Sequence, residues 1–374
     1  MASVEKRDDG RPRPWLVRWR DEAGKQRKKS FTRKVDADRF RSEVEHKLNT
    51  GNYVDPKVGR QTFQAYAEAW RAAQPHRHNT AVRTRSQLEK HVYPVFGSRP
   101  LAAIRPSELQ AFVTGLSATL APGSVRVVYS TVRAIFAAAL HDRIIVHDPA
   151  PPARSGRKGV RLPERPRTQV VPLTVEQVEA ILAALPPAYA ATGVLAAGAG
   201  PRQGEVLGLR PEDVDREART VKIDRQVQPG PDGTVEECAL KNGPSYRTVP
   251  VGQVVLDALA PHLADTKPGQ WLFRGKDGKP LHRSRYNESI WRPAVKAAGV
   301  EGATFHDLRH FYASALIRGG LSVKVVSSRL GHGNAAETLN TYSHLWPDDE
   351  DRTRQAIDDV LQGHVPHMRP NDGK

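Results

Sequence analysis

The C-terminal half of the chain holds arginines and histidines that are spaced to bind an anion. Arg202 lies near the predicted start of a helix, and the carboxylate of Glu205, three residues on, can brace it or a neighbour. His306 and Arg309 are also three residues apart, in the first turns of another predicted helix. Two cations at a helix N-terminus are unfavourable for the helix itself and suit an anion that docks there.

A histidine and a tyrosine complete the series. His332 directly follows Leu330 and Gly331, where a short helix capped by Ser322 is predicted to end. Tyr342 comes ten residues after His332. Each of these residues alone is more often structural than functional. The ordered series Arg-x-Gly-Glu, His-x-x-Arg, Leu-Gly-His and Tyr leaves little room for coincidence.

This series resembles the catalytic signature of the tyrosine recombinases of the phage-integrase type, in the same order and at similar spacing. The segments LGLRPEDVD at 207–215 and RTVPV at 247–251 resemble sequence of the same family. The resemblance implies that Tyr342 is the nucleophile and that Lys241, six residues before Arg247, is the general acid on a hairpin. It further implies that the catalytic set includes Arg202, His306, Arg309 and His332, with Glu205 supporting them.

The chemistry of phosphodiester cleavage explains why these residue types occur together. An in-line attack gathers negative charge on the non-bridging oxygens, and without a metal ion fixed cations such as Arg202, Arg309 and His332 must neutralise it. A phenol with a pKa near about 10 is a poor nucleophile, so a proton acceptor such as His306 must favour the phenolate. The phosphotyrosine ester conserves the bond energy, and we expect no cofactor and no metal.

Other functions fit parts of the same pattern. His306 and His310 have the i, i+4 spacing of a zinc-protease helix, but Asp307 stands where that chemistry needs a glutamate and no third ligand is obvious. A non-catalytic DNA-binding regulator on the same scaffold is a second alternative. A type IB topoisomerase uses the same chemistry, but it would not need a separate N-terminal domain.

Composition and charge indicate a polyanionic partner. The net charge is +16, and residues 1–168 carry all of the excess, because residues 169–374 hold 24 basic and 25 acidic side chains. The only cysteine, Cys238, excludes an internal disulfide and a multi-cysteine zinc site. We expect no apolar run long enough to cross a bilayer and no signal peptide, and therefore no membrane partner and a cytoplasmic, nucleoid-associated protein.

Hydrophobic patterns predict the elements that must position the site. Residues 14–20 and 26–33 predict a β-hairpin, and 36–49 a helix. Residues 61–148 have helical periodicity throughout, whereas 149–168 contain five prolines and six basic residues and are expected not to pack. In the last part, a capping box at Thr174 and Gln177 starts a helix, and residues 220–228 and 246–251 predict strands.

The expected fold is multidomain: a small N-terminal sheet plus helix, an all-α domain, and a mainly α (α+β) catalytic domain of the tyrosine-recombinase type. The expected ranges are 1–60 for an arm-type DNA-binding domain, 61–148 for a helical core-binding domain, 149–170 for a basic linker, 171–364 for the catalytic domain and 365–374 for a tail.

The resemblance implies a site-specific integrase that acts on double-stranded DNA with attachment core and arm sites, for a prophage or an integrative plasmid. It also leaves room for DNA-bending and excision-directionality factors. An apolar stripe near the C-terminus suggests assembly as a homotetramer on DNA, because such a stripe must find a groove on its own domain or on a neighbour's. The stripe consists of Ala356, Ile357, Val360 and Leu361.

Overall fold

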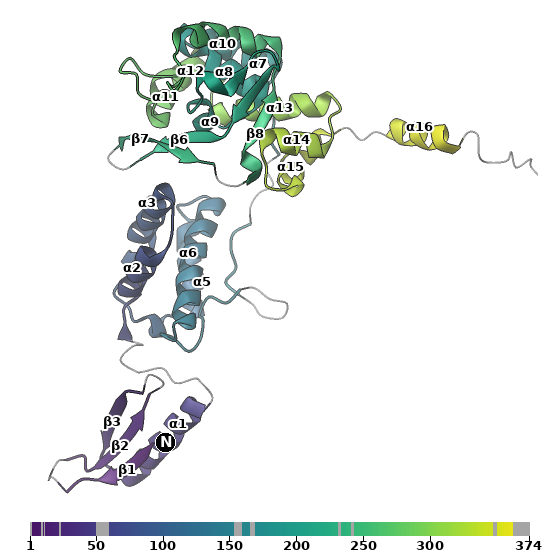
Figure 1. Ribbon diagram of the computed structural model, residues 1–374. Helices are drawn as coiled ribbons and strands as arrows, with labels where there is room; N and C mark the ends of the chain where they lie inside the picture. Colours follow the sequence, from purple (N-terminus) through teal and green to yellow (C-terminus); the bar gives the residue numbers. More distant parts are fainter. Residues whose placement is uncertain are drawn as a thin grey trace, which may run out of the picture. The chain divides into compact units, whose positions relative to one another are not determined.

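The computed structural model describes most of the chain and divides it into two compact units, Met1–Pro166 and Arg167–Lys374 (Figure 1). The residues that it describes are 2–8, 10, 12–21, 24–49, 60–152, 159–164, 169–230, 233–240, 243–346 and 350–361. Three separate hydrophobic cores lie within these units. The expected fold class is confirmed: a small sheet with a helix, a helical domain, and a mainly helical domain with small sheets.

The N-terminal domain is a three-stranded antiparallel sheet covered by one helix. Strands β1 (Ser3–Lys6), β2 (Trp15–Arg20) and β3 (Gln26–Phe31) pair in chain order, and α1 (Lys34–Asn49) packs on one face. Val17 and Trp19 alternate with exposed Arg18 and Arg20 along β2, so apolar side chains face the helix and basic ones face away. The predicted hairpin and helix are confirmed, and β1 was not predicted.

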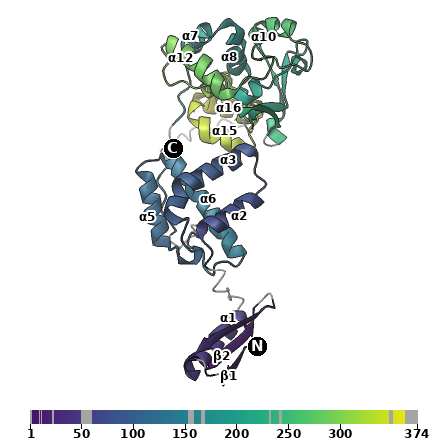
Figure 2. The same cartoon turned by 90° about the vertical axis from the view of Figure 1, so that its left-hand side faces the viewer.

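The second domain is a bundle of helices around its own core (Figure 2). Its main helices, α5 (Pro106–Ser117) and α6 (Pro122–His141), pack against each other, and α2 also contacts α6. The other elements are α2 (Phe63–Ala73), α3 (His78–Gln87), η2 (Leu88–Val92), α4 (Tyr93–Phe96) and η3 (Leu101–Ala103). The helical periodicity predicted for 61–148 is clearest in α6, whose buried residues include Val125, Val128, Val132, Ile135 and Ala139.

Helix α6 is long and apolar enough to cross a membrane by length and composition, contrary to the expectation that no such run exists. Its apolar residues instead form the centre of the helical domain, with Phe136 in contact with the ring of Phe63 on α2. A helix that is covered by its neighbours in this way is a core helix of the domain.

Part of the proline-rich segment packs, contrary to expectation. Val160 and Leu162 lie against the core of the helical domain, and the backbone of Arg161 exchanges two hydrogen bonds with the side-chain amide of Gln110. Arg126 also donates to the carbonyl of Pro163. Two apolar side chains and a few satisfied backbone groups are enough to dock an extended strand of chain, even where the composition is otherwise polar.

The C-terminal domain contains two small sheets and many helices. β5 is the middle strand between β4 and β8, while β6 and β7 form a separate hairpin, so the single strand predicted at 220–228 is divided at Asp224. The elements are α7 (Val175–Ala184), α8 (Pro187–Ala199), α9 (Gln203–Val206), η4 (Pro211–Asp213), β4 (Val214–Asp215), β5 (Thr220–Ile223), β6 (Arg225–Pro229), β7 (Val235–Ala239), η6 (Gly243–Ser245), β8 (Arg247–Pro250), α10 (Gln253–Asp265), α11 (Arg283–Tyr286), η7 (Asn287–Trp291), α12 (Arg292–Ala297), α13 (Phe305–Arg318), α14 (Val323–Leu330), α15 (Ala335–Tyr342), η8 (Ser343–Leu345) and α16 (Glu350–Leu361).

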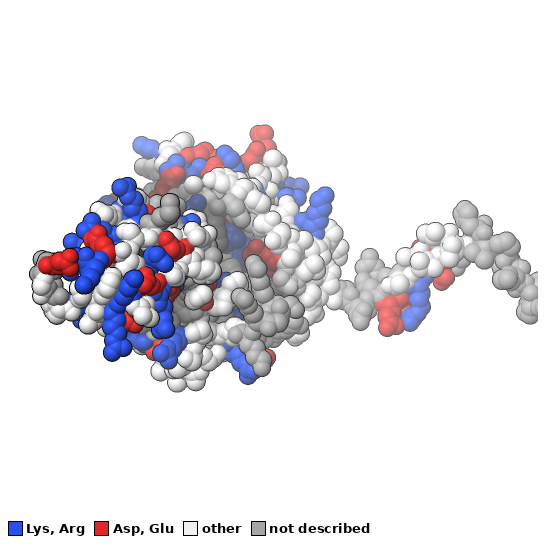
Figure 3. Space-filling model, turned by 90° about the horizontal axis from the view of Figure 1, so that it is seen from below, with Lys and Arg blue, Asp and Glu red and all other residues white. Residues whose placement is uncertain are grey.

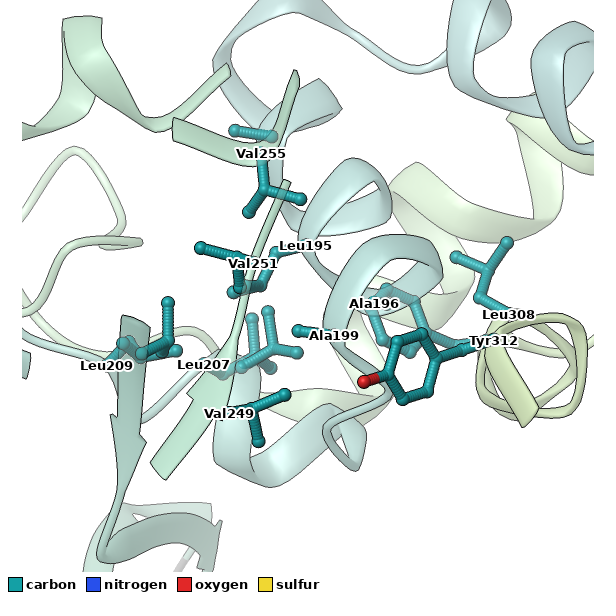
Figure 4. Packing of buried hydrophobic residues seen from close by; sticks show 14 of the residues in the cluster. Leu195, Ala196, Ala199, Leu207, Leu209, Val249, Val251, Val255, Leu308 and Tyr312 are labelled. Atoms are coloured by element: carbon teal, nitrogen blue, oxygen red, sulfur yellow. The ribbon is translucent and has the colours of Figure 1, made fainter. Parts of the chain in front are cut away.

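Helix α8 is the centre of this domain, because α7, α10 and α13 all pack against it. Its small residues, Ala196 and Ala199, allow close approach, and Figure 4 shows the ring of Tyr312 projecting from α13 toward them. The capping box predicted at the start of α7 is confirmed, since the side chain of Thr174 accepts from the N–H of Gln177 and the reverse bond is also made.

Gly200 ends α8 in a left-handed conformation, with φ of +67°, and faces Tyr312 closely. A Cβ atom at this position would lie 2.4 Å from Cδ1 of Tyr312, in addition to the backbone strain that a side chain incurs at positive φ. Gly299 has a similar φ of +69°, but nothing lies within 4 Å of the position of its Cβ.

We therefore expect Gly200→Ala to lower the free energy of unfolding of the C-terminal domain by about 3 kcal/mol, from strain and overpacking together. The matched change Gly299→Ala should cost only about 1 kcal/mol, from backbone strain alone. Urea unfolding of both variants measures the difference, and equal losses would contradict the close contact with Tyr312.

Candidate active site

Arg309 is the most deeply buried cation of the described residues, with 2% of its surface exposed. Its guanidinium donates to the backbone carbonyls of Gly200, at 2.7 Å, and Leu330, at 2.6 Å. These carbonyls end helices α8 and α14, so the negative ends of two helix dipoles point at the charge. No carboxylate within the described ranges forms an ion pair with it, which leaves a net positive charge in the interior.

Burial lowers the pKa of Arg309 to about 9, and the charge of Arg202 acts in the same direction. A buried cation that has only neutral partners is costly. An anion that binds beside it would remove that cost, so the arrangement favours a phosphate group over a neutral ligand.

Glu205 holds two further arginines at the same place. Its buried carboxylate accepts from the backbone N–H of Arg202 at 2.8 Å, from Nη1 of Arg202 at 3.0 Å, and from Nη2 of Arg247 at 2.8 Å. Burial alone would raise the pKa of Glu205, but the charges of Arg247 and Arg202 outweigh it, and the pKa lies below its usual range. Glu205 therefore braces Arg202, as predicted.

Arg247 connects three segments of the domain. Besides Glu205 on α9, its guanidinium donates to the carbonyls of Ser245, at 2.9 Å, and Arg329 on α14, also at 2.9 Å. A Cβ at Gly331 would lie 3.1 Å from Cδ of Arg247, so the turn before His332 closes directly over this side chain. Arg247 has no predicted site role, although it begins the RTVPV segment.

His332 lies where α14 ends in the left-handed residue Gly331, as the sequence predicts. Its Nδ1 lies 2.7 Å from Oγ1 of Thr338 on α15, which fixes the orientation of the ring. Burial lowers the pKa of His332 to about 4, and Arg309, Arg202 and Arg247 lower it further through their charges. The ring is therefore neutral at pH 7, with a carboxylate oxygen of Glu337 3.8 Å from its Nε2.

Tyr342 is the last residue of α15 and only 1% exposed. Its Oη lies 2.7 Å from Nδ1 of His310, one turn after His306 on α13. Burial raises the pKa of Tyr342 to about 12, and the charge of Arg309 opposes that rise. In this state the phenol is protonated and hydrogen-bonded to a histidine that the sequence does not assign to the site.

His306 keeps an exposed edge near the same cluster. Its ring packs edge-on against that of His310, with 4.8 Å between the ring centroids. Partial burial lowers the pKa of His306 to about 4. The charges of His310, Arg309 and Arg202 act in the same direction. The Asp307 carboxylate accepts from the backbone N–H of Thr304 at 2.6 Å and holds the start of α13.

Five of the six predicted catalytic residues thus lie in one electrostatically coupled cluster: Arg202, His306, Arg309, His332 and Tyr342. Lys241 lies outside the described residues, in the connection between β7 and η6. Arg247 and His310 join the cluster without having been predicted as site residues. A sequence signal existed for His310, four residues after His306 and one helical turn away, but its contact with Tyr342 depends on how α15 folds back.

The cluster can stabilise an oxyanion beside a phenol. Arg202 and Arg247 share one buried carboxylate and Arg309 pairs with backbone carbonyls instead, so these four side chains together carry a net positive charge. Among the described residues, no group of three or more histidine, cysteine or acidic side chains is placed to hold a metal ion. The cluster thus holds a phenol within electrostatic reach of fixed cations, the two kinds of group that cleavage of a phosphoester by a tyrosine requires.

Comparisons with known proteins agree with this chemistry. The model of the phage integrase family matches residues 172–348, and that of the phage integrase central domain matches 63–155. A chain assigned as the prophage phiRv2 integrase of Mycobacterium tuberculosis is 27% identical over 328 residues, which cover 84% of each chain. The integrase of Mycobacterium phage L5 is 25% identical over 279 residues, 72% of each chain.

Solved structures share the fold. The Tn1549 transposon integrase in complex with a circular intermediate DNA matches with a TM-score of 0.66 and 21% identity, over 80% of this chain and 99% of that one. A lambda integrase tetramer bound to a Holliday junction matches with a TM-score of 0.54 and 16% identity, over 93% and 95%.

The three-way contact of Arg247 gives a test of this site. Arg247→Ala should lower the free energy of unfolding by about 3 kcal/mol, because it leaves the buried Glu205 with one partner fewer. The matched change Arg354→Ala removes an exposed arginine paired with Glu350 and should cost less than about 1 kcal/mol.

Adding Glu205→Gln to Arg247→Ala should recover part of the loss, since the unpaired charge is then gone. Urea unfolding of the three variants provides the measurement. A loss no larger than that of Arg354→Ala would show that Arg247 does not hold the site together.

Proposed function

Because this chain belongs to the phage integrase family and is a site-specific tyrosine recombinase, we propose that it cuts and rejoins double-stranded DNA through a 3′-phosphotyrosyl bond at Tyr342. We further propose that it integrates and excises a mobile element such as a prophage or an integrative plasmid. The prophage and phage integrases among its relatives support this choice of element.

The observation that carries the mechanism is the buried charge of Arg309 near Tyr342. Two helix C-termini hold the guanidinium, and no carboxylate of the described residues neutralises it, so the scissile phosphate completes the site. Arg202, held by Glu205, and His332, held by Thr338, border the same space and bind the non-bridging oxygens as charge develops. His306 lies at the exposed edge of the cluster and donates to the phosphate from there.

The reaction has two symmetrical steps. Oη of Tyr342 attacks the phosphorus, a bond to the 3′-phosphate forms, and the 5′-oxygen leaves with a proton from Lys241. The 5′-hydroxyl of a second strand then attacks the phosphotyrosine, and the tyrosine leaves. Each step breaks one phosphoester and forms one, so neither nucleotide nor metal is needed.

The N-terminal domain is proposed to bind separate arm sites on the attachment DNA. On the sheet face opposite α1, Arg18 and Lys28 are paired directly across β2 and β3, with Arg20 next along β2. Glu5 on β1 already pairs with Arg18 at 2.7 Å, so Arg20 and Lys28 are the cations of this face that we propose to bind DNA phosphates. Figure 3 shows acidic side chains among the basic ones on the face in view. We therefore base the proposed DNA binding on the positions of particular cations and not on net charge.

Assembly as a homotetramer on DNA is proposed from α16. Its apolar residues Ile357, Val360 and Leu361 are exposed in this structure. A groove on a second copy of the chain would cover them, and the lambda integrase of similar fold was solved as a tetramer on a Holliday junction. We place the protein in the cytoplasm at the nucleoid, where DNA-bending and directionality factors act with it.

The first test concerns Tyr342. On a nicked suicide substrate the protein should form a covalent adduct in the presence of a chelator, and Tyr342→Phe should form none while binding the DNA as before. The change removes one buried hydroxyl and leaves the arginines in place. Adduct formation by the phenylalanine variant would reject Tyr342 as the nucleophile.

The second test concerns the N-terminal sheet. Replacing Arg20 and Lys28 by alanine should sharply reduce integration into long attachment DNA and leave cleavage of a minimal core site nearly unchanged, because only the long DNA offers arm sites. The control replaces Arg39 and Lys47, exposed on α1, and removes the same charge. Equal defects in both double variants would indicate unspecific electrostatic affinity.

A further inference from the structure

His310 makes the only described contact of its kind in the site: a ring nitrogen against the reacting oxygen of Tyr342. The Nδ1 atom lies 2.7 Å from Oη, and the two rings meet at 63° with centroids 5.6 Å apart. Neither the signature Arg-x-Gly-Glu, His-x-x-Arg, Leu-Gly-His and Tyr nor the proposed roles above include this residue.

We propose that His310 is the proton acceptor that activates Tyr342, and that His306 serves the phosphate instead. The proposal rests on Tyr342 as the nucleophile and adds a catalytic residue to the proposed reaction. A general base must lie within hydrogen-bond distance of the proton that it removes, and His310 meets that condition before DNA binds.

The surroundings of His310 suit a neutral ring that can accept a proton. Burial lowers its pKa, Arg309 lowers it further, and Asp307 opposes both. The other titratable groups around it are His306 on its own helix, Tyr342 and Glu337 on α15, and His332 at the end of α14. When the phosphate brings negative charge into the cluster, the imidazolium of His310 becomes more stable, so proton transfer is favoured as attack begins.

His306 has a different position. It is one helical turn earlier, keeps an exposed edge, and packs edge-on against His310 at 4.8 Å. The contact restricts rotation of the His310 ring and keeps its Nδ1 directed at the phenol. His306 therefore orients the acceptor and remains free to donate to the DNA.

In the proposed cleavage step, each bond that breaks is matched by a bond that forms. The Oη–H proton passes to Nδ1 of His310, the oxygen forms its bond to phosphorus, and the bond from phosphorus to the 5′-oxygen breaks. The 5′-oxygen takes a proton from the general acid. In rejoining, the deprotonated general acid takes the proton of the attacking 5′-hydroxyl, the bond from phosphorus to Tyr342 breaks, and His310 returns its proton to the departing Tyr342 oxygen.

A substrate with sulfur in place of the bridging 5′-oxygen isolates this step. Its thiolate leaves without needing a proton, so the general acid no longer affects the rate. Single-turnover adduct formation by the full chain is then measured from pH 5.5 to pH 9. For the unchanged protein the rate should level off above the lowered pKa of His310, and be flat near pH 7.

The variants are His310→Asn and the matched His306→Asn. Asparagine places an amide oxygen where Nδ1 was, so it can accept the phenol hydrogen bond but cannot take the proton. We expect His310→Asn to lose about 100-fold or more at pH 7 and to gain rate steadily as the pH rises, since hydroxide must then remove the proton. His306→Asn should lower the rate by a similar factor at every pH.

A third variant distinguishes loss of the proton acceptor from loss of the folded structure. His310→Ala leaves a space for imidazole, and added imidazole should restore adduct formation, in proportion to the basicity of the imidazole used. DNA binding and the melting temperature are measured for all variants.

The proposal is overturned if His310→Asn keeps a flat pH profile and a rate within a few-fold of the unchanged protein. It is also overturned if His306→Asn, rather than His310→Asn, acquires the rising profile. Failure of the proposed function looks different, because Tyr342→Phe would then still form an adduct in the same assay.

Discussion

The buried guanidinium of Arg309 is the constraint on which the catalytic domain depends. A cation in the interior is tolerated only where dipoles surround it, and here the carbonyl ends of α8 and α14 do so. Gly200 must take a left-handed conformation for α8 to end at this point, and Gly331 does the same for α14. One buried charge thus fixes how the helices α8, α13 and α14 meet. The same charge favours the binding of an anion.

Glu205 and Arg247 together fix the position of the Arg202 side chain. Arg202 lies at the start of α9, and a long flexible side chain there loses entropy on being held. The carboxylate of Glu205 fixes it, and Arg247 prevents that carboxylate from cancelling the positive field of the site. Because Arg247 also donates to the carbonyl of Arg329, the position of Arg202 is linked to the segment before His332 through three successive contacts, Arg202 to Glu205, Glu205 to Arg247 and Arg247 to Arg329.

Features set by local physics could be predicted from the sequence, and features set by tertiary contacts could not. The capping box at Thr174 and the helix end at Gly331 depend on a few neighbouring residues, and both are found as expected. The clustering of the site residues could be predicted from the sequence, because their order and spacing resemble a known catalytic signature. The hydrogen bond between His310 and Tyr342 joins residues 32 positions apart, and Val160 and Leu162 pack only because Gln110 satisfies the backbone between them. Periodicity and composition contain no information on such pairings.

The burial of Tyr342 has a consequence for the safety of the genome on which the enzyme acts. An ester formed on an oxygen that is almost wholly enclosed by protein is shielded from bulk water, although water is present at far higher concentration than any DNA end. Hydrolysis of the proposed phosphotyrosyl ester would leave a nick that ends in a 3′-phosphate, which the protein could not reseal. Tyr342 is 1% exposed without DNA; if the proposed ester forms in equally enclosed surroundings, the incoming 5′-hydroxyl, which is delivered with its own strand, has a kinetic advantage over water. The packing that makes the phenol a weak acid would then also protect the DNA from an unsealed nick.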